Sequence, residues 1–385
     1  MRAVRAVALA SMLCLAVPGC RRETRAGPAR DAGAARAHDP LPRLAPVVVR
    51  PAPAGPAPVP PTSRWRLLAL SGASRVEDNA IAHERNIRFV TESLVRLGVA
   101  RGAQRVLFAD GADPAIDVHY EESDPVERHR LYALGLFRTD TESAHDALHR
   151  FVDHTLPEAE PASLESVQRT LRDDARAATG ETEPAPLLVY VADHGRDTPR
   201  HDNSFIVLWG DQDLDVRALG DLLDAQPSRR RVVTVMSQCY SGAFASLVHE
   251  HGDPRRPLAA HDRCGFFAAP PDRPSAGCTP ETDESRYDDY TTWFFAALAG
   301  RDRTGRAVTD ADRDGDAVVS FAEAHRYALL NDETTDVPVT SSEEFLRAAF
   351  ERWLTTQRAR RTGIGEWLAT ARPALREDAL ALLAD

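Results

Sequence analysis

Two apolar runs decide the fold: LLVYVADHG at residues 187–195 and VVTVMSQCYSG at residues 232–242. Each run is short and unbroken and ends in small or polar residues, which is typical of a strand buried on both faces of a sheet. An amphipathic stretch precedes each of them, at residues 162–180 and 214–226, with apolar residues at helical spacing. Buried strands that alternate with helices predict an α/β fold with a mostly parallel central sheet flanked by helices.

The flanking sequence extends this pattern in both directions. Further strands are expected at 64–72, 104–111 and 204–210, helices at 83–99 and 290–300, and two more helices between Phe321 and the end of the chain. The apolar segment 264–270 completes the core. Residues 115–160 are polar and weakly patterned, so we expect a long loop or insertion there rather than a second domain.

Length and charge bound the possible functions. The chain has 385 residues and a formal net charge of -11. No basic stripe follows the N-terminal segment, which argues against a nucleic-acid partner. Because both ends look partly non-globular, we expect one folded domain at residues 64–340, followed by C-terminal helices at 341–385.

The N-terminus has the layout of an export signal. The first five residues include two Arg, at positions 2 and 5. An apolar run follows from Ala6 to Val17, and the segment ends in VPGC. The ending resembles a bacterial lipobox, which implies a signal peptide at 1–19, acylation of Cys20 and a membrane anchor. The Pro- and Ala-rich residues 20–63 predict an extended tether. We therefore expect a cell-envelope lipoprotein facing the periplasm or the exterior; an ordinary secretory signal is the alternative.

Two of the five cysteines belong to the N-terminal segment, so three thiols are left in the folded part of the chain. Removal of Cys14 with the signal and acylation of Cys20 leave Cys239, Cys264 and Cys278. In an oxidising compartment Cys264 and Cys278 would be able to form a disulfide around a loop rich in Pro and Gly, which would leave Cys239 free. The alternative is that all three thiols stay reduced.

A histidine and a cysteine each follow a predicted strand closely. His194 comes after one strand and Cys239 after the next strand of the pattern, 45 residues later. In open parallel sheets the carboxyl ends of the strands form the crevice where ligands bind, so the two side chains are expected to converge. A thiol beside an imidazole is a candidate nucleophile with its base. Gly195 allows close backbone approach to a ligand.

These blocks resemble the caspase-like cysteine peptidases, and within them the legumain-like branch. The resemblance rests on His194-Gly195, on CYSG at 239–242, on SGASRVEDNAIAH at 71–83 and on FADG at 108–111. It covers roughly residues 64–330 and implies a caspase-like three-layer sandwich that hydrolyses peptide bonds. It further implies that Cys239 attacks as a thiolate, that His194 transfers the proton, and that the amides of Gly195 and Cys239 bind the oxyanion.

The sequence departs from this family at the substrate pocket. Ser237 stands where caspases carry Gln, legumains Glu and metacaspases Asp, and Ala82 replaces an Arg before His83. Asn79 lies near the position of a legumain catalytic Asn. We take Ser237, His83 and Asn79 as pocket candidates, but no cleavage specificity carries over. The departures also motivate an alternative, an inactive caspase-like binding domain stabilised by calcium.

A third hypothesis is a metal-dependent hydrolase that uses Asp193, His194 and His201. These residues are of the ligating types, but their spacing matches no known metal motif. No organic cofactor is expected.

DRDGDAVVSFAE, at residues 312–323, matches the calcium loop of an EF-hand. The ligand positions 1, 3, 5, 7, 9 and 12 are filled by Asp312, Asp314, Asp316, the carbonyl of Val318, Ser320 and Glu323. Ala317 occupies the sixth position, where the sharp turn favours Gly, so binding should be strained and weak. We expect Ca²⁺ to order the domain or to gate its activity; a plain acidic loop is the alternative.

Overall fold

The computed structural model describes residues 64–135 and 148–355. The expected signal peptide, the acylation site at Cys20 and the tether therefore lie outside the described residues, as does the 356–385 part of the predicted C-terminal helices. All the described residues belong to one compact unit. Within them, no helix combines the length and the apolar composition that crossing a lipid bilayer requires.

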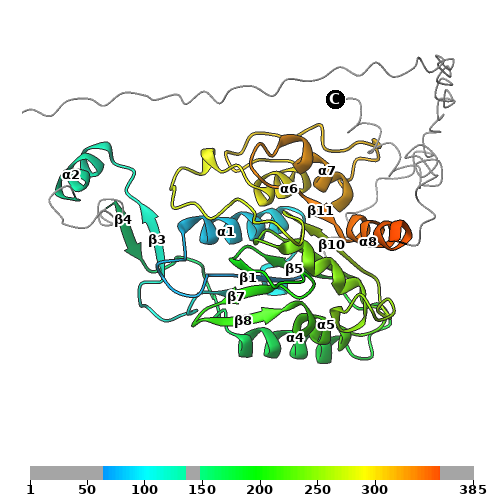
Figure 1. Cartoon of the computed structure of the whole chain (residues 1–385). Coiled ribbons are helices and arrows are strands. Elements are labelled where there is room, and N and C mark those ends of the chain that lie inside the picture. Colours follow the sequence, from blue (N-terminus) through cyan, green and yellow to red (C-terminus); the bar gives the residue numbers. More distant parts are fainter. Residues whose placement is uncertain (1–63, 136–147, 356–385) are drawn as a thin grey trace, which may run out of the picture. The chain divides into compact units, whose positions relative to one another are not determined.

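A six-stranded sheet forms the centre of the fold, with the strand order β11-β10-β9-β5-β1-β2 (Figure 1). The strands are β1 (Arg66–Ser71), β2 (Gln104–Phe108), β5 (Leu187–Val191), β9 (Val232–Met236), β10 (Arg263–Phe267) and β11 (Val339–Thr340). All neighbours pair in parallel except β11, which runs antiparallel to β10. The predicted α/β fold with a mostly parallel sheet is confirmed.

Helices cover both faces of this sheet (Figure 1). On one side lie α1 (Ile81–Arg96), α6 (Tyr290–Ala299) and α7 (Phe321–Asn331), and on the other α4 (Leu164–Ala178) and α5 (Val216–Asp224). Side chains alternate along each strand, so Leu67 and Ala69 enter the first core whereas Leu68 and Leu70 enter the second. Two hydrophobic layers around one sheet make the predicted three-layer sandwich.

Shorter elements and the last helix complete the domain. The 3₁₀ turns are η2 (Arg101–Ala103), η3 (Ser241–Val248), η4 (Glu250–Gly252) and η5 (Glu284–Arg286), and the last helix is α8 (Ser341–Thr355). Helix α8 follows β11 without a linker and contacts β10 and η3. The predicted boundary at residue 340 therefore separates two parts of one packed unit.

Residues 115–160 hold more structure than a long loop. Strands β3 (Val118–Glu121) and β4 (His149–Val152) form an antiparallel pair, and α2 (Pro125–Gly135) follows β3. Of the two expectations, the insertion holds and the long loop does not. A two-stranded ladder of four residues a side leaves too short an alternation to recognise in sequence. The insertion stays attached to the body through a parallel bridge between Ala80 and His119.

The predicted strand at 204–210 does not join the central sheet. It is β7 (Phe205–Leu208), which lies between β6 (Gly195–Arg196) and β8 (Gln212–Asp215) in a small antiparallel sheet. The N–H of Val207 donates to the carbonyl of His194 at 3.0 Å. This second sheet thus holds the main chain directly at His194.

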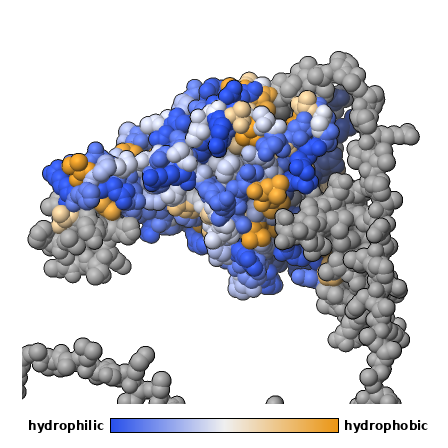
Figure 2. All heavy atoms as spheres, turned by 90° about the horizontal axis from the view of Figure 1, so that it is seen from above, coloured by the Kyte–Doolittle hydropathy of each residue, from blue (hydrophilic) through white to orange (hydrophobic). Residues whose placement is uncertain are grey.

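The face of the molecule seen from above is mainly polar. Figure 2 shows a face on which hydrophobic areas are small and separated by hydrophilic ones. The most exposed large apolar side chains lie apart in the sequence: Ile116, Val126, Leu258 and Leu330. Singly exposed apolar residues such as Ile116 are normal for a folded domain.

Candidate active site at the carboxyl end of the sheet

The structure brings His194 and Cys239 to the same edge of the sheet. They follow β5 and β9, which are adjacent and parallel, with Val191 opposite Met236 at the last paired position. The backbones touch as well, since a Cβ built on Gly195 would lie 1.9 Å from the carbonyl oxygen of Cys239. The two strand ends predicted to converge therefore do so, and only glycine fits at position 195.

Main-chain contacts fix the imidazole of His194. Its Nε2–H donates to the carbonyl of Asp78 at 2.8 Å, which leaves Nδ1 unprotonated in the neutral ring. The carboxylate of Asp193 accepts from the N–H of His194 at 2.6 Å and from the N–H of Ala73 at 3.0 Å. Burial raises the pKa of Asp193 well above its usual range, although these two amides oppose the shift. His194 thus presents one nitrogen as a base or as a ligand.

The thiol of Cys239 sits on a sharp turn between β9 and η3. Tyr240 has a left-handed backbone, with φ 60° and ψ 20°, and its N–H donates to the carbonyl of Arg273 at 2.8 Å. The half-buried sulfur accepts from the N–H of Ser275 at 3.4 Å and lies 3.8 Å from the Ser275 carbonyl. The turn places the half-buried thiol at the carboxyl end of a buried strand.

The disulfide considered for Cys264 and Cys278 is not formed, since both are free thiols. Cys264 lies near the start of β10, and Cys278 lies at the carboxyl edge, with its sulfur 3.9 Å from Nδ1 of His194. Of the two alternatives, the structure shows the reduced thiols. β10 runs the length of the sheet between Cys264 and Cys278, so a short sequence separation does not make them neighbours.

Cys278 is a member of the site that sequence reasoning assigned to another role. Although the residue as a whole is exposed, desolvation of its thiol and the nearby Cys239 and Asp193 raise the pKa of Cys278 to about 12. It therefore stays protonated at neutral pH unless a cation binds it. Asp78 and Ser275 were also missed, because they act through main-chain atoms that leave no signature in sequence.

A second histidine lies against the first. The ring of His83 stands edge-on to that of His194, with centroids 5.2 Å apart. Its Nδ1–H donates to Oδ1 of Asn79 at 3.1 Å, and the Asn79 amide donates to the carbonyl of Asp117. Burial lowers the pKa of His83 well below its usual range, with help from His194 and His119. Two of the pocket candidates, His83 and Asn79, are thus buried neighbours of His194.

Ser237, the third pocket candidate, lies beneath the site. It is 9% exposed, and its hydroxyl pairs with the hydroxyl of Thr291, at the start of α6, at 2.6 Å. Its carbonyl accepts from the Ser275 hydroxyl at 2.7 Å. In this position Ser237 joins α6 to the loop that contacts the thiol, and its own hydroxyl is already engaged.

The trio of the third hypothesis is not assembled. Asp193 turns its carboxylate to the amides of Ala73 and His194, whereas His201 pairs with Asp197 at 2.6 Å and is partly exposed. Asp193 and His201 are not part of any group of close metal-binding side chains among residues 64–135 and 148–355. A hydrolytic metal held by Asp193, His194 and His201 is thus contradicted.

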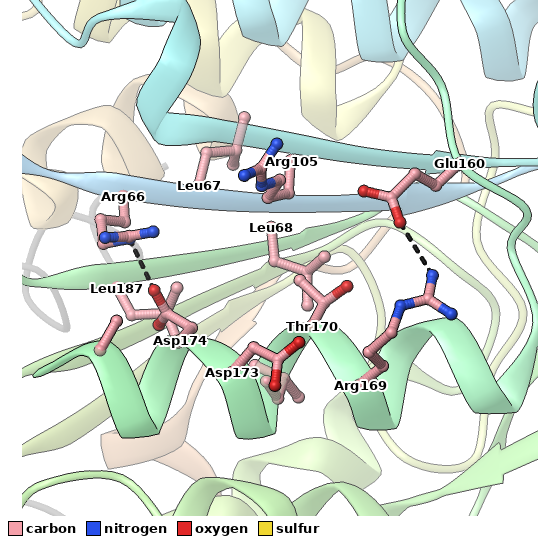
Figure 3. A pocket seen from close by; sticks show the side chains of 12 residues that line it. Arg66, Leu67, Leu68, Arg105, Glu160, Arg169, Thr170, Asp173, Asp174 and Leu187 are labelled. Carbon is pink, nitrogen blue, oxygen red and sulfur yellow. Dashed lines mark hydrogen bonds and ion pairs between the residues drawn. The ribbon is translucent and has the colours of Figure 1, made fainter. Parts of the chain in front are cut away.

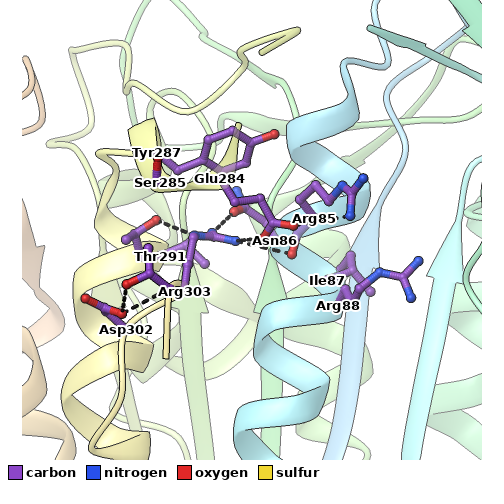
Figure 4. A network of polar contacts seen from close by, with 12 residues as sticks. Arg85, Asn86, Ile87, Arg88, Glu284, Ser285, Tyr287, Thr291, Asp302 and Arg303 are labelled. Atoms are coloured by element: carbon purple, nitrogen blue, oxygen red, sulfur yellow. Dashed lines mark hydrogen bonds and ion pairs between the residues drawn. The ribbon is translucent and has the colours of Figure 1, made fainter. Parts of the chain in front are cut away.

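Two contacts hold the loop of residues 275–289 over the site. The carboxylate of Asp336 accepts from the N–H of Ala276 at 2.6 Å, and burial raises the pKa of Asp336 to about 7. Figure 4 shows Arg303 between α1 and the loop, where it donates to the side chains of Asn86 and Glu284. Its guanidinium also lies over the ring of Phe89, 4.5 Å from the centroid. The loop is thereby tied to α1 and to the segment after α7.

Three of the six predicted ligands of the loop 312–323 are brought together, whereas Asp316, the Val318 carbonyl and Ser320 are not in this group. Carboxylate oxygens of Asp312, Asp314 and Glu323 lie within 4.8 Å of one another, so these three are candidate cation ligands. Ala317, at the turn position that favours Gly, has φ 69° and is therefore strained. Glu323 also forms a capping box with Ser320 at the start of α7. Whether Ca²⁺ binds there stays a prediction.

A separate depression of about 330 Å³ lies at the opposite end of the strands. It runs between the start of β1 and helix α4, as Figure 3 shows. Ion pairs span it, from Arg66 to Asp174 at 2.6 Å and from Arg169 to Glu160 at 2.8 Å. Because most of its charges are paired and the reactive side chains lie at the other end of the sheet, we assign it a structural role.

No family model matches the sequence, and no curated protein matches it significantly. Among solved structures, the chain is similar to protein GSU0716 of Geobacter sulfurreducens, with 12% identity, a TM-score of 0.40, and coverage of 72% of this chain and 92% of that one. It is also similar to a secreted C11 cysteine protease of Bacteroides thetaiotaomicron solved with an irreversible peptide inhibitor, with 11% identity, a TM-score of 0.26, and coverage of 55% and 49%. Both similarities are remote.

Proposed function

We propose that the protein is a caspase-like cysteine endopeptidase with Cys239 as nucleophile and His194 as general acid and base. The observation that carries this proposal is the convergence of the two residues on adjacent strand ends, where Nδ1 of His194 is left to accept a proton and lies 3.9 Å from the sulfur of Cys278. A thiol on a sharp turn beside an oriented imidazole is the arrangement that nucleophilic acyl transfer needs.

The residues at the strand ends provide for each step of peptide hydrolysis. The sulfur of Cys239 attacks the carbonyl carbon after His194 accepts the thiol proton, and the developing oxyanion accepts hydrogen bonds from the amides of Gly195 and Cys239. His194 then donates the proton to the leaving amine, which yields a thioester and the first product. A water molecule, deprotonated by His194, hydrolyses the thioester and restores the thiol.

The charge beside the site favours a basic substrate side chain. A depression of about 350 Å³ next to Cys278 is lined by Glu281, Asp288 and Asp289, against one guanidinium, that of Arg286. The N–H of Asp283, together with the paired Arg286, holds the pKa of Glu281 below its usual value, so this carboxylate is charged at neutral pH. The surplus of carboxylates complements Arg or Lys.

A diverse peptide library tests this substrate class. Incubated with the full chain, it should be cleaved at least about 10-fold faster next to Arg or Lys than next to Glu, a difference of about 1.4 kcal/mol in transition-state binding. The substitutions Asp288→Asn and Glu281→Gln should reduce this preference. Equal cleavage next to acidic and basic residues would contradict the role of the depression and leave the thiol mechanism standing.

One observation favours the alternative, an inactive binding domain of the same fold. The thiol that lies beside Nδ1 of His194, at 3.9 Å, is that of Cys278 and not that of Cys239. A thiol-reactive probe separates the two functions. For an enzyme, labelling of Cys239 should slow by at least about 10-fold in His194→Ala, because the imidazole generates the thiolate. Unchanged labelling would favour the binding domain.

We also propose that the acidic loop 312–323 binds Ca²⁺ as a structural ion. The loop begins the α7 unit, whose His325 bonds the hydroxyl of Tyr290 on α6, and Asp336 beyond α7 holds the loop that carries Cys278. An ion at this place would order α7. Through α7 it would also steady the contact of His325 with Tyr290 and the contact of Asp336 with the loop that carries Cys278. Hard carboxylate oxygens suit Ca²⁺, and the strain at Ala317 should make the affinity low.

Calcium should raise the melting temperature of the wild type, and Glu323→Gln should remove that effect. Ca²⁺ at ten times its Kd would add about 1.4 kcal/mol to the free energy of unfolding, or a few degrees in the melting temperature. Gln can keep the capping box but lacks the bidentate charge. Thermal melts with and without Ca²⁺ measure this, with the exposed Glu333→Gln as the matched control. An equal calcium effect in both variants would contradict the site.

We further propose, from the sequence of the first 63 residues, that the protein is anchored in the cell envelope by acyl chains on Cys20. The apolar run, its VPGC ending and the tether support this. Metabolic labelling with a fatty-acid analogue should mark the wild type and leave Cys20→Ser unlabelled.

A further inference from the structure

We propose that His83, His194 and Cys278 form a binding site for a zinc-type transition-metal ion. Nitrogen atoms of the two imidazoles and the sulfur of Cys278 lie within 4.8 Å of one another. The three residues come from α1, from the end of β5 and from the loop 275–289, so the fold, and not a sequence motif, assembles them. No part of the proposed peptidase mechanism requires His83 or Cys278.

The two histidines are prepared as metal ligands by the groups behind them. The Nε2–H of His194 donates to the Asp78 carbonyl and the Nδ1–H of His83 donates to Asn79, so the other nitrogen of each ring carries a lone pair. Metal-binding histidines almost always show this second hydrogen bond, which fixes the tautomer and the ring orientation. Both rings are thus set to give a lone pair to one ion.

The second ring nitrogen of His83, Nε2, has no hydrogen-bond partner among residues 64–135 and 148–355. His83 is 2% exposed, and its Nε2 is buried without a hydrogen bond. Leaving a buried polar atom without a hydrogen bond lowers the stability of the fold, so such atoms are rare in folded proteins. A metal ion between His83, His194 and Cys278 would satisfy the atom directly.

The geometry and the donor types favour Zn²⁺. In a tetrahedral zinc site, a nitrogen at about 2.0 Å and a thiolate at about 2.3 Å from the ion stand about 3.5 Å apart. The distance between Nδ1 of His194 and the sulfur of Cys278 is 3.9 Å, so only a small movement is needed. Two imidazoles and one thiolate suit Zn²⁺, whereas Ca²⁺ and Mg²⁺ take oxygen ligands. A fourth position remains for water or another ligand.

Occupation of this site would withdraw His194 from catalysis. The ion would use Nδ1, the nitrogen that accepts the thiol proton in the proposed peptidase mechanism. Zn²⁺ should therefore inhibit the enzyme reversibly, and a chelator should restore it. This regulatory consequence rests on the proposed function, whereas the binding of the ion does not.

Direct binding measurements test the site without any assay of activity. Titration of the full chain with Zn²⁺ in competition with a chromophoric chelator should show one strong site, and Co²⁺ in its place should give a thiolate-to-cobalt absorption band. Cys278→Ser and His83→Gln should each weaken binding at least about 100-fold and remove the band. Cys264→Ser, a free thiol elsewhere, and Glu323→Gln, in the acidic loop, should change neither.

Each outcome decides between the proposals. Zinc binding that survives Cys278→Ser, or that is lost in Cys264→Ser, would overturn the site. If His83→Gln fails to fold by circular dichroism, the Cys278→Ser variant, at an exposed position, still gives the answer. A chain that binds Zn²⁺ as expected but cleaves no peptide would refute the peptidase and leave the metal site intact.

Discussion

Replacing Cys239 by Ala should lower peptide cleavage by at least about 10³-fold while the domain stays folded. The mechanism has no other group on the β9 turn that can form the acyl intermediate, so its loss removes the covalent route and not merely substrate affinity. Ala fits the left-handed turn that follows, because the change leaves the backbone of Tyr240 untouched. The measurement is kcat/KM for the best peptide of the library, with circular dichroism as the check on folding.

Two further cysteine variants make this result specific. Cys264→Ser should keep full activity, since that thiol lies near the start of β10, away from the carboxyl edge that holds the site. Cys278→Ser should keep cleavage and lose sensitivity to zinc. If Cys239→Ala stays active and Cys278→Ser does not, the nucleophile has been assigned to the wrong thiol, and the mechanism proposed here fails.

The second large effect is expected from one added methyl group, in Gly195→Ala. The new Cβ would lie 1.9 Å from the carbonyl oxygen of Cys239 and 2.9 Å from its carbonyl carbon, both main-chain atoms that cannot swing away. The two strand ends must separate, which we expect to lower the free energy of unfolding by about 3 kcal/mol. A displacement near 1 Å at reacting groups costs activity about 100-fold.

Gly102→Ala provides the matched control. A Cβ at Gly102, in η2, meets no atom within 4 Å, so the same chemical change should alter stability by less than about 1 kcal/mol and leave cleavage unchanged. Denaturant unfolding of the two variants beside the wild type measures the difference. Equal stability in both would mean that the contact between Gly195 and Cys239 does not constrain the site.

The unbroken apolar runs and the amphipathic stretches in the sequence were sufficient to predict the central sheet and its flanking helices. The buried runs at 187–195 and 232–242 formed adjacent parallel strands, because continuous apolar residues can only be satisfied by cover on both faces. That pairing placed His194 and Cys239 at one edge. The weakly patterned residues 115–160 and the strand at β7 gave wrong or incomplete expectations, since short antiparallel ladders depend on neighbours that a linear pattern does not reveal.

The hydrogen bonds that position the side chains of the site were not predictable from the sequence, for a different reason. The carbonyl of Asp78 that orients His194, and the amide of Ser275 near the thiol, belong to the main chain, which is the same at every residue. Cys278 was considered only as a possible disulfide partner or a reduced thiol, because counting thiols treats distance along the chain as distance in space. A loop held by Asp336 and Arg303 places it at His194 instead.

The anchoring of that loop by Asp336 bears on the order in which structure is lost on heating. Asp336 lies just before β11, a two-residue strand at the rim of the sheet, whereas β5 and β9 are central and wholly buried. Rim strands open at lower free energy than central ones. When β11 unfolds locally, the hydrogen bond from the N–H of Ala276 to Asp336 is lost with it. The loop that contacts both thiols then loosens while the central strands are still folded. Inactivation by heat should thus precede melting of the domain.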